Sequence, residues 1–135
     1  MGFSTATVDT QHFVTISDCS NEGNMTSATC RTSGICAAAN RRTKMVNCIN
    51  KGNQLNSCPG PDKGRIANIA CNVANVSSMT GCVNYGDIIS TTSARTAGIA
   101  NLSNNCEFTN CANYGNVQSD NKYRGLFWAY NNGLA

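Results

Sequence analysis

Short apolar segments alternate with polar, turn-forming segments along the whole chain. Each apolar segment has the length of a strand, and the Asn, Ser, Thr and Gly residues between them favour tight turns. Three apolar blocks recur in order, anchored on a repeated cysteine and then on an arginine. They are Ile16, Met45, Met79 and Phe108 three residues before the cysteine; Met25, Leu55, Ile88 and Val117 six or seven residues after it; and the segments 31–35, 65–69, 95–99 and 124–128. The pattern predicts three short strands per period.

A six-residue signature, Cys-x-Asn-x-Gly followed by Asn or Asp, occurs four times, at 19–24, 48–53, 82–87 and 111–116. Its cysteines lie 29, 34 and 29 residues apart, a period typical of stacked repeats. We interpret the glycine as a left-handed corner of the backbone, where a Cβ would clash. We expect the cysteines and asparagines to form inner ladders when the coils stack, made of Cys19, Cys48, Cys82 and Cys111 and of Asn21, Asn50, Asn84 and Asn113.

These features predict an all-β chain folded as a parallel β-helix, or β-solenoid, with about four coils of 29–34 residues. The coils are expected near 13–41, 42–75, 76–104 and 105–130, within one repeat domain over 1–135. The longer period carries its extra residues at 57–64, where two prolines and two glycines cannot continue a paired strand. We expect this insertion to leave a corner without disturbing the stack. Because open solenoid ends expose unpaired strands, we expect a fragment of a longer array that associates end to end.

Composition narrows the classes of partner. The chain is 41% hydrophobic and 13% charged, with a net charge of +3. This mild basicity lacks the clustering of a nucleic-acid binder. No apolar run approaches the roughly 18–20 residues of a membrane helix, so we expect no membrane insertion. The N-terminus shows no signal peptide, so the protein either stays inside the cell or is a piece of something longer.

The repeated phrase resembles the GLUG-like, Cys-x-Asn-x-Gly β-helix repeats of bacterial surface proteins and related adhesins. The resemblance covers about residues 13–130, and the Gly-Gly-Ile/Leu-Val-Gly block of those repeats is present in degenerate form at 97–100 and 33–36. It implies an extracellular or cell-surface location, as part of a longer secreted protein, and an adhesive role. It implies no shared catalytic site.

The chain has nine cysteines, an odd number, so not all of them can form disulfides within one chain. The signature cysteines are expected as inward thiols that behave as small hydrophobes. Cys30 and Cys58 fall at the same corner of consecutive coils and are the best candidate disulfide, with Cys36 and Cys71 as a weaker one. The chain has no Cys-x2-Cys pair and a single histidine, His12, so we expect no metal site and no cofactor.

Two outward columns are the candidate ligand-binding residues. Arginines recur once per coil at Arg31, Arg65, Arg95 and Arg124, and tyrosines occupy equivalent corners at Tyr85 and Tyr114. The arginines either extend into solvent or form a track for the carboxylates or sulfates of an anionic polysaccharide, because guanidinium groups bind such anions in bidentate fashion. The tyrosines either pack on each other or stack on sugar rings.

We therefore expect a non-catalytic structural or adhesive module whose partner is an anionic glycan or a host surface protein. A polysaccharide lyase or glycosidase is the alternative, although its paired carboxylates are not evident among the seven scattered acids. A self-assembling fibre subunit or an ice-binding solenoid is the second alternative. For ice binding we interpret Thr15, Thr80 and Thr109 as one row, interrupted by Val46.

Overall fold

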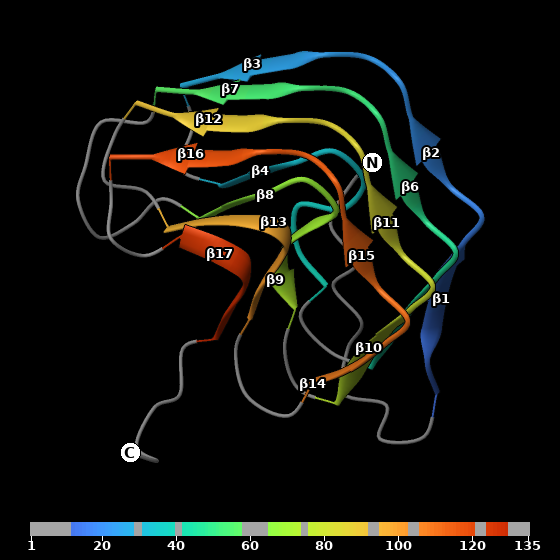
Figure 1. Cartoon of the computed structure of the whole chain (residues 1–135). Helices are drawn as coiled ribbons and strands as arrows, with labels where there is room; N and C mark the ends of the chain where they lie inside the picture. The colour runs from blue at the N-terminus through green and yellow to red at the C-terminus, as the bar shows by residue number, and fades with distance from the viewer. Residues whose placement is uncertain are drawn as a thin grey trace.

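The computed structural model describes residues 12–28, 31–39, 42–57, 65–73, 76–91, 95–102, 106–120 and 124–129. Every regular element in these ranges is a β-strand, and every strand pair is parallel. The strands of successive coils lie side by side, so the chain winds into a stack (Figure 1). The expected parallel β-helix is confirmed.

Four sheets run along the stack, and each takes one strand from every coil. The first contains β1 (Val14–Ser17), β5 (Thr43–Val46), β10 (Ser77–Thr80) and β14 (Cys106–Thr109). The second contains β2 (Ser20–Asn21), β6 (Ile49–Asn50), β11 (Val83–Asn84) and β15 (Ala112–Asn113). The third contains β3 (Met25–Ser27), β7 (Gln54–Asn56), β12 (Ile88–Ser90) and β16 (Val117–Ser119). The fourth contains β4 (Arg31–Ser33), β8 (Arg65–Ala67), β13 (Arg95–Leu102) and β17 (Arg124–Ala129), with β9 (Ala70–Val73) also paired to β13.

Each coil therefore contributes to four sheets rather than the expected three, because the signature supplies a two-residue strand of its own, and the second coil carries β9 as a fifth strand. A bend in the backbone directly before the signature cysteine separates the first sheet from the second. The residues at this bend have positive φ: Asp18 (54°), Asn47 (53°), Gly81 (64°) and Asn110 (53°). Asp, Asn and Gly are the residue types that tolerate this left-handed conformation.

The signature glycine is not the left-handed corner, which corrects the interpretation made from the sequence. Gly81 is the only glycine with positive φ among the described residues. From the second coil onward, at Gly52, Gly86 and Gly115, the signature glycines are instead favoured by the close stacking of successive corners. A Cβ on Gly86 would lie 2.6 Å from the carbonyl carbon of Gly52 and 2.9 Å from Nδ2 of Asn50. At either distance a Cβ would force the neighbouring coil to shift, so the position strongly favours glycine.

Strand register confirms most of the apolar columns and corrects one. Ile16 pairs with Met45, which pairs with Met79, as expected. In the third sheet, however, Met25 pairs with Gln54 and not with Leu55. Leu55 points outward and is 44% exposed, whereas Gln54 occupies the inner position and is 3% exposed.

The threonine row is also corrected by the register. Thr15 pairs with Lys44, and the residue that pairs with Val46 in the first coil is Ser17. Thr80 and Thr109 do share the Val46 column. Only two threonines therefore stand in that row, which weakens the case for a regular ice-binding face.

The five-residue difference in period leaves the stack intact, as expected. Ser27 pairs with Asn56 before the insertion, and Arg31 pairs with Arg65 after it. Segment 58–64 itself lies outside the described residues. The coil thus returns to register within the same corner.

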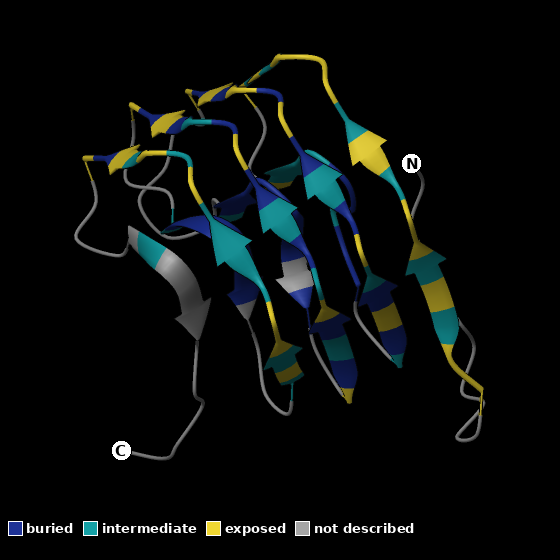
Figure 2. Ribbon diagram, turned by 45° about the vertical axis from the view of Figure 1, so that its right-hand side comes forward, coloured by how far each residue is buried: buried dark blue, intermediate teal, exposed yellow. Residues whose placement is uncertain are grey.

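The buried residues, dark blue in Figure 2, include both apolar and polar side chains. The larger apolar cluster includes Met45, Met79, Ile69 and Ile99 with the signature cysteines around them. Alongside it, asparagine side chains are also fully buried: Asn50, Asn56, Asn68, Asn84 and Asn101 are each no more than 1% exposed. Such groups are stable inside only when they are hydrogen-bonded, which explains the ladders described below. In the part of the chain that the structure describes, no helix is long and apolar enough to span a membrane.

Candidate functional site

An asparagine ladder runs along the corner between the second and third sheets. Nδ2 of Asn21 donates to Oδ1 of Asn50 (2.8 Å), Asn50 donates to Asn84 (2.8 Å), and Asn84 donates to Asn113 (2.6 Å). Each Nδ2 also donates to the carbonyl of the signature glycine in its own coil, at 2.7–2.9 Å. Every rung is thus tied both to its own turn and to the next coil, and the corner is held rigid.

A second ladder lies on the outer side of the same corner, at the last signature position. The backbone N–H of Asn53 donates to Oδ1 of Asn24 (2.9 Å), that of Asp87 to Asn53 (2.8 Å), and that of Asn116 to Asp87 (2.8 Å). Asn116 also donates through Nδ2 to Asp87, at 3.2 Å. This ladder is exposed to solvent, so its amide and carboxylate groups are available to a ligand as well as to the backbone.

Two stacked tyrosine rings project from this corner. The ring centroids of Tyr85 and Tyr114 lie 5.2 Å apart with an interplanar angle of 14°. Tyr85 is 53% exposed and Tyr114 is 71% exposed. The equivalent positions in the first two coils are Glu22 and Lys51, which form an ion pair at 2.7 Å. This ion pair lowers the pKa of Glu22 and raises the pKa of Lys51 through the hydrogen bond that joins them.

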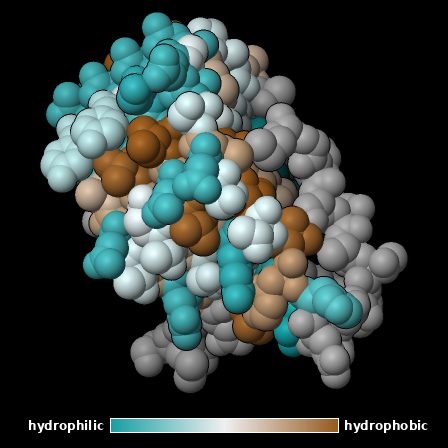
Figure 3. All heavy atoms as spheres, turned by 90° about the vertical axis from the view of Figure 1, so that its right-hand side faces the viewer, coloured by the Kyte–Doolittle hydropathy of each residue, from teal (hydrophilic) through white to brown (hydrophobic). Residues whose placement is uncertain are grey.

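A shallow groove of about 260 Å³ lies on the third sheet, and Asp87 in its lining follows Tyr85 by two residues along the chain. Its polar wall is formed by the second ladder, at Asn24, Asn53 and Asp87, and its apolar wall includes Leu55 and Ile89. These two apolar side chains are 44% and 39% exposed. On the neighbouring face, Figure 3 shows apolar side chains beneath a strongly hydrophilic upper edge.

We call this combination of Tyr85, Tyr114, the second ladder, Leu55 and Ile89 the tyrosine corner. Sequence reasoning found the tyrosines but missed the groove. The signal was present, because the last signature position reads Asn, Asn, Asp and Asn and recurs on the outside of every coil. Aligning Leu55 with Met25 and Ile88, whereas the register pairs it with Ile89, concealed the apolar wall.

The arginine column is only partly formed. Arg31, Arg65 and Arg95 are in register on adjacent strands. Arg124 is not, because it pairs with Thr96. Each arginine is the first residue of a strand in the fourth sheet, so along the chain it comes after the strand of the third sheet. The tyrosines come before the strand of the third sheet. The two candidate columns therefore belong to different corners and do not make one binding surface.

The signature cysteines point inward, with Cys48 and Cys82 fully buried and Cys19 and Cys111 half-buried at the two ends. All are free thiols. Hydrogen bonds to the thiols of Cys111 and Cys48, together with burial, raise the pKa of Cys82. Cys48 and Cys82 therefore act as core, whereas the thiols of Cys19 and Cys111 stay partly accessible at the two ends of the ladder.

The remaining cysteines that the structure describes, Cys36, Cys71 and Cys106, are free thiols. Cys36 and Cys71 lie on adjacent coils, where the backbone N–H of Cys71 donates to the carbonyl of Cys36 (3.1 Å), but both are free. The weaker disulfide candidate is therefore wrong. Burial raises the pKa of Cys71 to about 12. Cys30 and Cys58, the best candidates, lie outside the described residues.

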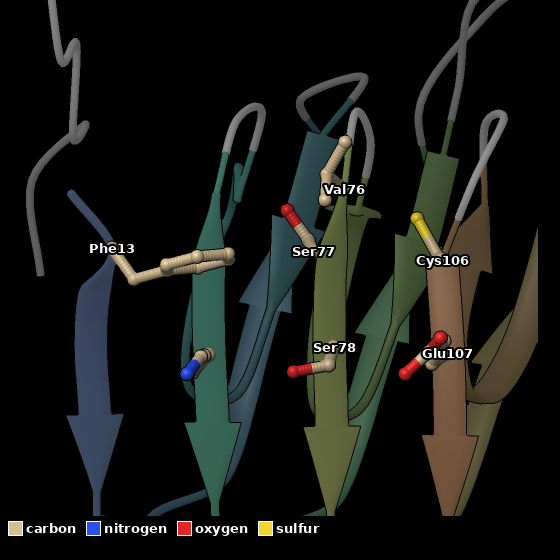
Figure 4. A pocket seen from close by; sticks show the side chains of 7 residues that line it. Phe13, Val76, Ser77, Ser78, Cys106 and Glu107 are labelled. Atoms are coloured by element: carbon tan, nitrogen blue, oxygen red, sulfur yellow. The ribbon is translucent and has the colours of Figure 1, made fainter. Parts of the chain in front are cut away.

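A second hollow, of about 380 Å³, lies on the outer face of the first sheet (Figure 4). It is lined by Phe13, Lys44, Val76 and Glu107, among others. The ammonium of Lys44 sits 4.4 Å from the centroid of the Phe13 ring, and the guanidinium of Arg42 sits 5.4 Å from it. Because the protein's own cations already occupy this ring, the hollow is a poorer platform for a ligand than the tyrosine corner.

The described residues contain no cluster of ionisable side chains that would indicate a metal site. No group of three or more His, Cys, Asp or Glu side chains there is placed to hold a metal ion. Glu22 is engaged by Lys51, and Asp87 by Asn116. Glu107 stands on the first sheet, away from both.

Comparison with known proteins identifies no relative of the chain. No protein-family profile, no curated protein and no solved structure matches the chain.

Proposed function

We propose that this chain is a non-catalytic recognition module in which a rigid solenoid presents the tyrosine corner to an extended glycan. The observation that carries the proposal is the exposed Tyr85–Tyr114 stack, which stands two residues along the chain from Asp87 in a groove walled by amides and a carboxylate. Sugars bind through the same two features, because their C–H faces pack on aromatic rings and their hydroxyls pair with Asn and Asp side chains.

The local charge favours a neutral glycan at this corner. Lys51 is neutralised by Glu22, and the groove contains the carboxylate of Asp87. An anionic chain would approach that carboxylate unfavourably, whereas neutral hydroxyls would donate to it. Among the described residues, one oxygen of Asp87 accepts from Asn116 and the other accepts no hydrogen bond.

Anionic polysaccharide is a second candidate ligand, at the arginine row. Arg31, Arg65 and Arg95 stand on adjacent strands, roughly 4.8 Å apart along the stack. A row of guanidinium groups at this spacing matches a polymer with regularly placed carboxylates or sulfates.

We also propose that the module belongs to an extracellular or surface protein and serves in adhesion, either to a glycan or to a host surface protein. The resemblance to the Cys-x-Asn-x-Gly repeats of bacterial surface proteins supports this proposal. The corner between the second and third sheets suits a passive scaffold, since both of its ladders are hydrogen-bonded to the backbone. An enzyme would need paired acids in one groove.

Direct binding measurements separate these candidates. Titration calorimetry with a neutral β-glucan, a uronate polymer and heparin is run on the wild type, Tyr114→Ala and the double variant Arg65→Ala/Arg95→Ala. Neutral-glycan binding that falls roughly ten-fold in Tyr114→Ala supports the tyrosine corner, since one lost aromatic contact is worth about 1 kcal/mol or more.

Matched controls sharpen the result. Thr109→Ala changes an exposed side chain on the first sheet of the same coil, away from the groove, and should leave neutral-glycan binding unchanged. Binding of heparin that is lost only in the arginine variant would assign the site to the arginine row instead. Binding of no polymer, or shortening of any polymer during incubation, would overturn the proposal of a non-catalytic glycan module.

A further inference from the structure

The two ends of the stack expose parts of the interior. Met45 and Met79, in the middle coils, are 0% exposed, whereas Ile16, their counterpart in the first coil, is half-buried. The signature cysteines follow the same trend, with Cys19 and Cys111 half-buried at the ends. Strands β2 and β15 are the outermost strands of the second sheet, so each has one unpaired edge among the described residues.

The asparagine ladder gives these ends opposite hydrogen-bonding character. Each asparagine donates to the oxygen of the asparagine in the following coil. Within the described ranges, Oδ1 of Asn21 in the first coil therefore accepts no hydrogen bond. At the other end, Nδ2 of Asn113 donates only to Gly115 (2.7 Å), so one of its two N–H groups has no partner in those ranges.

The second ladder is polarised in the opposite sense and leads to the same pairing of ends. Each backbone N–H donates to the side-chain oxygen of the preceding coil. Among the described residues, Oδ1 of Asn116 in the last coil thus lacks a donor, and the N–H of Asn24 in the first coil lacks an acceptor. Both ladders leave a donor at one end that faces an acceptor at the other.

We propose that a second copy of this chain stacks head to tail on the first, with the fourth coil of one copy in register against the first coil of the next. Asn113 then donates to Asn21 of the next copy, and Asn24 of that copy donates to Asn116. Both ladders continue across the junction without a break. The exposed edges of β15 and β2 pair in the same way as their neighbours do within the chain.

Side-chain charge permits this junction. In the register of the first three sheets, Glu107 meets Thr15, Tyr114 meets Glu22, and Asn110 meets Asp18 of the next copy. No like charges face each other in these columns. The last pair has a precedent inside the chain, where Nδ2 of Asn47 donates to Oδ1 of Asp18 at 3.4 Å.

Head-to-head stacking lacks this complementarity, because it would place the acceptor of Asn21 against a second acceptor. A head-to-tail contact between unlike ends does not close on itself and generates open filaments. Each copy adds four strand spacings, so the filament should rise about 19 Å per subunit.

The test introduces a like-charge pair at the junction and then removes it. Asn110→Asp places a carboxylate about one strand spacing from Asp18 of the next copy and should weaken association at least four-fold at low salt, since two such charges repel by nearly 1 kcal/mol even in water. Asp is compatible with this left-handed position, because Asp18 already adopts φ 54°. The double variant Asn110→Asp/Asp18→Asn should restore association, and Gln118→Glu, which faces the uncharged Thr26, should have no effect.

Sedimentation velocity over a concentration series measures the association of all four proteins, and circular dichroism confirms that each keeps its strand content. The expected order is wild type equal to Gln118→Glu and to the double variant, with Asn110→Asp weaker and partly rescued by salt. A wild type that stays monomeric at every concentration would overturn the proposal, as would association that Asn110→Asp does not weaken. Glycan binding is measured separately, so loss of the tyrosine corner leaves this test intact.

Discussion

Replacing the signature glycines by alanine, one coil at a time, tests why glycine occupies this position. If glycine served a left-handed backbone, every copy would be equally intolerant of a Cβ. The structure predicts a graded series instead, because the obstacle is the preceding coil. At Gly23, in the first coil, the nearest atom to an added Cβ is Oδ1 of Asn21 at 3.8 Å, which is an ordinary contact.

At Gly86 the same Cβ would lie 2.6 Å from the carbonyl carbon of Gly52, which is 0.8 Å short of the 3.4 Å at which ordinary contact begins. It would also press on Nδ2 of Asn50 at 2.9 Å. Relieving both contacts requires the two coils to separate at a ladder rung. Overpacking costs about 1–3 kcal/mol, and the loss of a buried ladder hydrogen bond adds roughly 1 kcal/mol more. We therefore expect Gly86→Ala to lower the free energy of unfolding by about 2–4 kcal/mol.

Gly23→Ala is the matched control and should be neutral or should stabilise the fold by up to about 1 kcal/mol, because alanine reduces the freedom of the unfolded chain. Urea unfolding followed by circular dichroism gives both values under one condition. Equal destabilisation by the two substitutions would refute the stacking explanation and restore the left-handed corner. An unchanged Gly86→Ala variant would refute both.

Three further outcomes follow from the described contacts. Asn84→Ala removes the partner of Asn50 and Asn113 in the buried ladder and should cost about 2–5 kcal/mol in urea unfolding, whereas Gln118→Ala should cost almost nothing. The pKa of Glu22, measured by NMR titration, should lie below its ordinary value and return to that value in Lys51→Gln. The ion pair stabilises the fold at pH values above the ordinary pKa, and this stabilisation is lost as the pH falls through the lowered pKa. An unchanged titration midpoint in Lys51→Gln would count against the ion pair. Cys71, with a pKa of about 12, should resist alkylation at pH 8 until the protein unfolds, as read by peptide mass spectrometry, and rapid modification of the folded protein would contradict its burial.

Much of the architecture could be predicted from the sequence because the repeat carries it. The Cys-x-Asn-x-Gly phrase recurs once per coil. A buried asparagine such as Asn84 must be hydrogen-bonded, and the equivalent asparagine of the next coil is the partner that the repeat supplies. The jump from a period of 29 to one of 34 could also be assigned to a corner, since prolines cannot pair inside a sheet.

The errors came from features that sequence alone does not separate. Glycine suits both a left-handed backbone and a close approach, and only the neighbouring coil distinguishes the two at Gly86. The true left-handed column reads Asp18, Asn47, Gly81 and Asn110, a consistent set of turn formers that was overlooked because it precedes the cysteine. A one-residue slip reverses the face of a strand, and hydrophobicity aligned Leu55 with Met25 where the register aligns Gln54.

The corner between Asn56 and Arg65 has a consequence for how such a chain can change. In the first coil Ser27 and Arg31 are four positions apart, whereas Asn56 and Arg65 are nine positions apart, yet Ser27 pairs with Asn56 and Arg31 with Arg65. Residues added at this corner therefore do not change the pairing with the neighbouring coils. A foreign loop, an epitope or a whole binding domain inserted at this corner should be carried on the outside of the rod at a fixed height along its axis, which makes the corner a natural place for diversification between otherwise identical repeats.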